Sequence, residues 1–213
     1  MNFVPDTPVL FAFSIACIVL AVTPGPDMTL FVSRALSQGR SAGFMSMAGA
    51  LTGSVVHTMM VAFGLSALIA ASASAFFAVK IVGALYLVWL AVDTIRHGSA
   101  LTVSREKTER KSMSRVFMTG LLVNLLNPKI ALFFLTFLPQ FVEASDPDAA
   151  GKLIFLGLFF VALSIPICAA MVVGADAFSS TLRRSPKVMR VFDWLFATVI
   201  GGFAVKLVLA SRS

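Results

Sequence analysis

The segment Thr23-Pro24-Gly25-Pro26-Asp27-Met28 interrupts a long apolar run and decides how this chain can fold. Apolar and small residues fill positions 8–22 before it, and a second helical stretch follows it. A proline inside a helix removes a backbone donor and clashes with the preceding turn, and the residue before a proline is pushed toward extended geometry. Two prolines around Gly25 therefore predict a helix break, in which the glycine is expected to adopt conformations closed to other residues.

The composition of the whole chain indicates an integral membrane protein. Hydrophobic residues make up 58% of the 213 residues and charged residues only 13%, and the mean hydropathy is +0.93. Soluble domains average about 45–50% apolar and about 25% charged residues. The chain is therefore expected to form one all-α transmembrane domain over residues 1–213, surrounded by membrane lipid.

The lipid environment gives the helix break a functional meaning. Irregular backbone inside a membrane is tolerated only where it is buried in protein or lines a cavity. The break is therefore also a predicted binding site. Asp27 lies inside it, and an ionisable residue at membrane depth is a functional candidate because its burial is costly.

Three classes of protein do not fit the sequence. The net charge is +7, but the basic residues lie between apolar runs instead of forming one stripe, so no nucleic-acid partner is predicted. Cys17 and Cys168 lie in apolar segments without metal-ligand spacing, which predicts small buried hydrophobes and neither a metal nor another cofactor. The chain has no zinc-protease spacing, nucleophile elbow or Cys/His pair with a plausible partner, so no catalytic residue is predicted and an enzyme is not expected.

Six apolar stretches are long enough to cross a membrane. A hydrocarbon core of about 30 Å requires about 20 apolar residues in a helix. The first stretch is broken at positions 23–27, and the fourth is broken at Asn127-Pro128-Lys129. The predicted spans cover residues 8–36, 43–70, 75–95, 116–142, 152–178 and 191–210.

The distribution of Lys and Arg predicts the orientation of these spans. The connections after the first, third and fifth spans contain twelve Lys and Arg residues, whereas the opposite side contains only two. Positive residues are retained on the cytoplasmic side. Both termini are therefore predicted to lie outside the cytoplasm.

The six spans divide into two halves of three, and each half begins with a helix broken at proline. A repeat with an odd number of spans must be inverted in the membrane. Interrupted apolar segments at corresponding positions of two halves indicate the binding site of a transporter, where half-helix N-termini offer N–H groups to an anion. The sequence thus predicts two inverted three-helix repeats with a site at the two breaks.

Three motifs resemble one family of transporters. They are TPGPDM at 23–28, KIVGALYLVWLAV at 80–92 and FMTGLLVNLLNPKIALFFLTFLPQF at 117–141. Together with the length and the six spans, they resemble the lysine-exporter/homoserine–threonine-resistance (LysE/RhtB) family of amino-acid translocators. The resemblance implies a multi-pass protein of the bacterial cytoplasmic (inner) membrane that exports amino acids or related metabolites, driven by the proton gradient or the membrane potential. It does not identify the amino acid.

The residues at the breaks are compatible with a zwitterionic substrate. N–H groups after Gly25 and Lys129 can donate to a substrate carboxylate, whereas Asp27 and the freed carbonyls near Thr23 and Asn127 can accept from a substrate ammonium group. Asn124 and Asn127 add neutral hydrogen-bonding groups on one helical face. The candidate substrate-binding residues are Thr23, Pro24, Gly25, Pro26, Asp27, Asn124, Asn127, Pro128 and Lys129.

Several alternatives remain open for single residues. Asp27 can serve as a helix cap, and Lys129 can pair with Asp27 as a structural bridge. Asp27 and His57 are the candidates for proton coupling, although His57 can instead be a packing residue. Asp193 is expected to pair with basic residues at the membrane interface. The phenylalanines of the fourth and fifth spans are expected to face lipid or pack in the core and not to form an aromatic cage.

Two alternatives also remain open for the whole protein. A membrane channel for small solutes is the competing function, because broken helices also line selectivity filters. The sequence does not decide between a monomer and a homo-oligomer.

Overall fold

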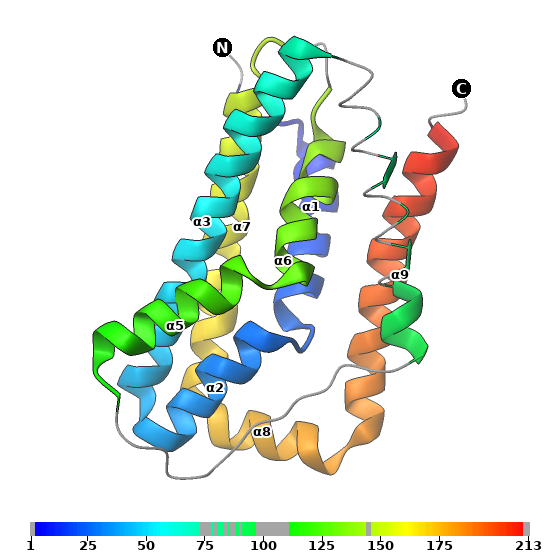
Figure 1. The fold of residues 1–213 in the computed structure, drawn as a ribbon. Coiled ribbons are helices and arrows are strands. Elements are labelled where there is room, and N and C mark those ends of the chain that lie inside the picture. Colours follow the sequence, from blue (N-terminus) through cyan, green and yellow to red (C-terminus); the bar gives the residue numbers. More distant parts are fainter. Residues whose placement is uncertain are drawn as a thin grey trace.

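The computed structural model describes residues 3–72, 78, 81–82, 85, 88–89, 91–96, 111–143 and 146–210, and the regular structure in these ranges is entirely helical (Figure 1). The predicted all-α class is thus confirmed, while about half of the third predicted span, 75–95, lies outside the described residues. The elements are α1 (Thr7–Val22), α2 (Pro26–Gln38), α3 (Arg40–Ala71), α5 (Met113–Leu125), α6 (Pro128–Leu132), the π-helical η1 (Phe133–Phe137), the 3-10 helix η2 (Leu138–Phe141), α7 (Ala149–Val173), α8 (Ala175–Arg184) and α9 (Pro186–Ala210).

Both predicted helix breaks are present. The chain bends by 51° between α1 and α2 and by 52° between α5 and the helical segment 128–141. Each second half-helix begins with a proline, Pro26 or Pro128, in its first turn, where the missing N–H has no intrahelical role. The breaks lie side by side at mid-height, and the two broken helices run in opposite directions along the bundle (Figure 1).

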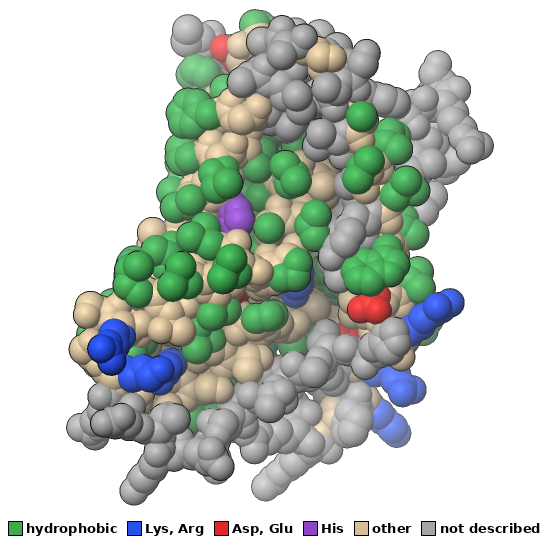
Figure 2. Space-filling model, viewed as in Figure 1, with side chains coloured by type: hydrophobic (Ala, Val, Ile, Leu, Met, Phe, Trp, Pro, Cys, Tyr) green, Lys and Arg blue, Asp and Glu red, His purple; other side chains and the backbone are tan. Residues whose placement is uncertain are grey.

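Within the described ranges, the molecule has two helices long and apolar enough to cross a membrane, or up to four if each bent pair counts as one span. The two unbroken ones are residues 40–64 of α3 and 149–173 of α7. On the face in Figure 2, hydrophobic side chains cover a broad belt, and the coloured Lys and Arg side chains lie at mid-height and below. Exposed apolar side chains such as Met60 and Phe63 on α3 suit a lipid environment.

The prediction for the fifth span was wrong at its C-terminal end. The span was expected to continue to residue 178, but α7 ends at Val173 and the chain turns at Gly174 into the separate helix α8. Helix α8 lies across the lower end of the bundle, between α7 and α9 (Figure 1). Its acidic, hydroxyl and arginine residues would be costly to place in hydrocarbon, which explains why this segment does not extend the span.

Two apolar clusters form the core. The first is rich in phenylalanine and joins α1, η1 and α7, with Phe13, Phe133, Phe134, Phe137 and Phe160 at most 4% exposed. The ring centroids of Phe133 and Phe137, for example, are 5.0 Å apart. The second cluster joins α2, α3 and α7, with Met28, Phe31, Val32, Met47, Met171 and Val172 among its members. These phenylalanines therefore pack in the core, as one of the two expectations stated.

Helices α3 and α5 approach each other through glycines. A methyl group at Gly49 would lie 2.1 Å from the carbonyl oxygen of Phe117, and one at Gly120 would lie 2.2 Å from that of Ser46. Small residues allow such close backbone contact between helices in a membrane. The contact positions α5, which ends at the second break.

We expect Gly49→Ala to push α3 and α5 apart and to destabilise the protein by about 1–3 kcal/mol, because a backbone carbonyl cannot turn aside as a side chain can. Gly64→Ala on the same helix is the matched control, since a methyl group there has no atom within 4 Å. Thermal unfolding of the detergent-solubilised variants measures the difference. Equal midpoints for the two variants would contradict the close α3–α5 packing.

Candidate functional site

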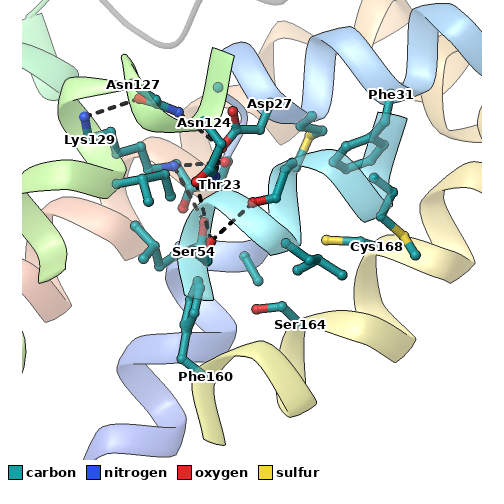
Figure 3. A pocket seen from close by; sticks show the side chains of 18 residues that line it. Thr23, Asp27, Phe31, Ser54, Asn124, Asn127, Lys129, Phe160, Ser164 and Cys168 are labelled. Atoms are coloured by element: carbon teal, nitrogen blue, oxygen red, sulfur yellow. Dashed lines mark hydrogen bonds between the residues drawn. The ribbon is translucent and has the colours of Figure 1, made fainter. Parts of the chain in front are cut away.

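A cavity of about 60 Å³ lies where the two helix breaks meet. It sits between the two apolar clusters, since members of both line it (Figure 3). Among the described residues that line it, Asp27 and Lys129 alone are charged. The full lining is Leu20, Ala21, Thr23, Gly25, Asp27, Met28, Phe31, Met47, Ala50, Leu51, Ser54, Asn124, Asn127, Lys129, Ile130, Phe160, Ser164 and Cys168.

Asp27 comes from the first break and is held by the second. Its Oδ2 accepts hydrogen bonds from the side-chain amides of Asn124, at 2.8 Å, and Asn127, at 3.2 Å. Its Oδ1 is buried and has no hydrogen-bond partner among the described residues. The carboxylate makes no capping bond to α2, whose N-cap is Gly25, so the capping interpretation of Asp27 was wrong.

Lys129 comes from the second break and is bound to the first. Its Nζ donates to the backbone carbonyl oxygens of Thr23, at 2.9 Å, and Leu20, at 3.4 Å. In a continuous helix the Leu20 carbonyl would accept from the N–H of residue 24, which is a proline and has none. Lys129 therefore replaces a hydrogen bond that the break removes.

The surroundings of Lys129 include α9 as well. Its Nζ lies 5.0 Å from the centre of the Phe196 ring, within cation–π range. The carboxylates of Asp27 and Asp193 both interact electrostatically with the Lys129 ammonium group. Among the described residues, no direct ion pair joins Asp27 and Lys129. Asp193 is 4% exposed, so its side chain lies against the protein interior.

The second break is satisfied in a similar way. The carbonyl of Asn124 would bond to the N–H of residue 128 in a continuous helix, and residue 128 is again a proline. This carbonyl accepts instead from the Asn127 N–H, at 3.1 Å, and lies 3.4 Å from His57 Nε2, which donates when it carries the ring proton. The Asn127 side chain accepts from the Lys129 N–H, at 3.1 Å, and so caps α6.

His57 lies outside the cavity, next to the second break. It is 7% exposed, stacks on Phe134 with ring centroids 5.7 Å apart, and does not line the cavity. Of the two candidates for proton coupling, Asp27 is thus in the cavity and His57 is outside it.

Helix α3 also positions Asn124. Ser54 Oγ lies 3.5 Å from Asn124 Oδ1, and a methyl group at Gly53 would approach the same oxygen to 2.5 Å. The Asn124 amide group is therefore confined between α3 and the Asp27 carboxylate.

The role expected for Gly25 needs a correction. Its φ of −169° and ψ of −179° describe extended backbone that any residue can adopt, so the position does not require glycine for its conformation. A methyl group there would meet only Lys129, at 3.8 Å. The glycine instead leaves the space beside the Lys129 side chain open.

The structure brings most of the predicted site residues to one cavity. Thr23, Gly25, Asp27, Asn124, Asn127 and Lys129 line it, whereas Pro24, Pro26 and Pro128 form the breaks without lining it. Sequence reasoning missed the wall formed by α7, which contributes Phe160, Ser164 and Cys168. Their i, i+4, i+8 spacing on one helical face was the available signal, but the surrounding residues are apolar almost throughout.

The family of the chain follows from its comparison with known proteins. The family model of LysE type translocators matches residues 18–211, which include both breaks and all the residues that line the cavity. No solved structure matches the chain.

Individual relatives are similar over nearly their whole length. An uncharacterized membrane protein of Vibrio cholerae is 30% identical over 208 residues, covering 96% of this chain and 98% of the relative. The homoserine/homoserine lactone efflux protein of Salmonella typhimurium is 28% identical over 189 residues, covering 89% and 90%. The uncharacterized membrane protein YrhP of Bacillus subtilis is 28% identical over 205 residues, covering 92% and 97%. The chain therefore belongs to the LysE type translocators, and it is a membrane transport protein and not an enzyme.

Proposed function

We propose that this protein exports amino acids or related metabolites across the bacterial cytoplasmic membrane by secondary transport, with the substrate bound in the cavity between the two helix breaks. The observation that carries the proposal is the pair of opposite charges in one small cavity, where the buried Asp27 Oδ1 has no partner. The homoserine/homoserine lactone efflux relative supports a small amino-acid-like substrate.

The two charges match the two charges of an amino-acid zwitterion. The substrate ammonium group binds Asp27 Oδ1, which has a free acceptor position, while Asn124 and Asn127 hold the other carboxylate oxygen. The substrate carboxylate binds the Lys129 ammonium group. A charge-assisted hydrogen bond in a site shielded from water is stronger than one between neutral groups.

Substrate binding changes the bonds that satisfy the first break. In the structure, Lys129 donates to the Thr23 and Leu20 carbonyls. A substrate carboxylate competes with these carbonyls for the same ammonium group, and its binding weakens the link between the two broken helices. Such competition gives the substrate a differential affinity for two conformations, which any ligand-driven change requires.

Energy coupling is proposed at Asp27. A proton and a substrate ammonium group compete for the same carboxylate, so a proton that enters the site favours release of the substrate. Export driven by the proton gradient requires this mutual exclusion. The membrane potential contributes about 2.3 kcal/mol per elementary charge per 100 mV to any net charge that moves.

The decisive experiment measures transport of an amino acid into inverted vesicles or proteoliposomes against its concentration gradient. We expect the wild-type protein to accumulate amino acid uphill when a proton gradient is imposed, and Asp27→Asn to lower this rate by more than about tenfold while the protein still folds. The variant keeps the shape of the side chain but removes its charge and titration. Substrate flux that only follows the concentration gradient would identify a channel and contradict the proposal.

Lys129→Met tests whether the two charges merely neutralise each other. The single variant leaves the buried Asp27 uncompensated, at a cost of about 3–5 kcal/mol. The double variant Asp27→Asn with Lys129→Met should recover only part of the lost membrane abundance, because the Thr23 and Leu20 carbonyls still lack the Lys129 donor. It should not recover export, because both substrate-binding charges are lost. Recovery of export as well would show that the pair is only structural.

His57 is proposed to support the second break and not to carry the coupled proton. His57→Gln keeps a donor for the Asn124 carbonyl and should retain export with an unchanged pH profile, whereas His57→Leu leaves this carbonyl one donor short and should destabilise the protein by about 1–3 kcal/mol. Loss of proton dependence in His57→Gln, at normal abundance, would instead assign the coupling to His57.

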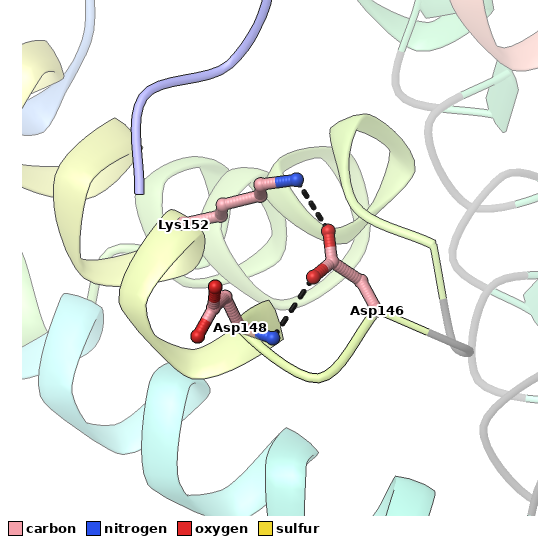
Figure 4. Close-up of polar contacts among 3 residues, drawn as sticks. All are labelled: Asp146, Asp148 and Lys152. Atoms are coloured by element: carbon pink, nitrogen blue, oxygen red, sulfur yellow. Dashed lines mark hydrogen bonds and ion pairs between the residues drawn. The ribbon is translucent and has the colours of Figure 1, made fainter. Parts of the chain in front are cut away.

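The proposed orientation places both termini outside the cytoplasm. Helix α1 begins and α9 ends at the same end of the bundle (Figure 1). The loop before α7 belongs to this proposed outer side, where Asp146 accepts hydrogen bonds from Lys152 Nζ and from the Asp148 N–H, the latter at 2.9 Å (Figure 4). These hydrogen bonds hold the pKa of the Asp146 carboxyl below its usual range, and the bond from Lys152 has the largest effect.

Reporter fusions test this orientation. A fusion at Lys187, near the start of α9, should report the cytoplasm, and fusions at Asp146 and at the C-terminal residue 213 should report the outside. The reason is the retention of Lys and Arg on the cytoplasmic side. A cytoplasmic signal at residue 213 would contradict both the orientation and the six-span arrangement.

A further inference from the structure

We infer that the α7 wall of the cavity is a side-chain subsite, in which Ser164 selects amino acids whose short, uncharged side chain carries a hydrogen-bonding group. The inference rests on the proposed function, because it assumes that the amino-acid backbone occupies Asp27 and Lys129. It adds the residue that distinguishes one amino acid from another.

Ser164 differs from the other buried hydroxyl residues near the breaks. Thr23, Ser54 and Thr58 each donate to the carbonyl oxygen four residues earlier, at 2.6, 3.4 and 2.9 Å. This is the usual way in which a hydroxyl inside a helix is satisfied. Ser164 is 2% exposed, and its Oγ has no hydrogen-bond partner within the described part of the chain. The hydroxyl lines the cavity instead of bonding to its own helix (Figure 3).

A buried hydroxyl without a partner indicates a position where an atom of a ligand can complete the hydrogen bonding. Buried polar groups in folded proteins are nearly always hydrogen-bonded. Two such atoms line this cavity, Asp27 Oδ1 and Ser164 Oγ. The first suits the ammonium group of the substrate, so the second remains for a polar atom of its side chain.

The residues around Ser164 limit the rest of the side chain. Phe160 and Cys168 lie one helical turn to either side on α7, and Met28, Phe31 and Met47 close the cavity from α2 and α3. None of these side chains carries a charge. Since Asp27 and Lys129 are used by the substrate backbone, a charged side chain would find no counter-ion in the cavity, and its desolvation would be uncompensated.

The subsite therefore fits an aliphatic side chain that ends in a hydroxyl or a comparable neutral polar group. A site that hydrogen-bonds a substrate hydroxyl discriminates against the analogue that lacks it, because the protein group is then left unpaired. A net hydrogen bond of this kind corresponds to about a tenfold difference in affinity.

The experiment compares two ligands that differ only in a hydroxyl group. L-homoserine and L-2-aminobutyrate are titrated into the purified full-length protein in detergent, with L-lysine and L-glutamate as charged competitors. The wild-type protein should bind homoserine about tenfold more tightly than 2-aminobutyrate and should bind the charged amino acids more weakly than either. Ser164→Ala should bind homoserine and 2-aminobutyrate equally and keep its affinity for 2-aminobutyrate.

Ser46→Ala is the matched control. Ser46 is 1% exposed and its Oγ also lacks a partner, but it does not line the cavity. This variant should keep the wild-type preference for homoserine. A loss of preference in Ser46→Ala equal to that in Ser164→Ala would show a general packing effect and overturn the subsite.

The outcomes separate this inference from the proposed function. Equal binding of homoserine and 2-aminobutyrate by the wild-type protein, or an unchanged preference in Ser164→Ala, overturns the subsite while amino-acid binding stands. Tightest binding of lysine or glutamate overturns the predicted side-chain class. Absence of binding by all four amino acids, in protein that is folded by its thermal unfolding profile, overturns the proposed function together with the subsite.

Discussion

The structure depends on two backbone N–H groups that prolines remove. Without an N–H at positions 24 and 128, the carbonyls of Leu20 and Asn124 lose their helical partners, and a bilayer offers no water to replace them. The chain satisfies each carbonyl with a side chain from the opposite half: Lys129 donates to Leu20, and His57 Nε2 lies 3.4 Å from the Asn124 carbonyl oxygen. The two breaks are therefore tied to each other, and the irregular backbone of each is buried against the other half.

Hydrogen bonds between the two breaks also bring the charged residues together in the cavity. Asp27 belongs to the first break but is held by two asparagines of the second, whereas Lys129 belongs to the second and is bound to carbonyls of the first. A purely structural arrangement would pair the two charges directly and leave no polar atom without a partner. Here the charges are separated onto other groups, and one carboxylate oxygen stays without a hydrogen bond. That incomplete satisfaction is the feature that a bound zwitterion would complete.

Local chemistry explains what could be predicted from the sequence. A proline acts on its own helix, so both breaks and the candidate residues beside them could be placed from Pro24 and Pro128 alone. The reach of Lys129 back to α1, the burial of Asp193 and the inward turn of Ser164 depend on which helices pack together, and no local pattern encodes that. The end of α7 was missed because the apolar residues of α8 extend the hydropathy of the span, although its polar residues repeat at helical spacing.

The reciprocal arrangement also has a consequence for motion. Lys129 is the proposed partner of a substrate carboxylate and also the donor that stabilises the first break, so in this proposal substrate binding and helix geometry are coupled. A ligand that draws Lys129 away from the Thr23 carbonyl leaves the end of α1 with fewer hydrogen bonds. A change in the angle between α1 and α2 then requires less free energy. Pro128 prevents α5 and α6 from joining into one continuous helix, so the chain stays bent at the second break. Movement of the half-helices around a bound substrate is thus the response that this pattern of hydrogen bonds favours.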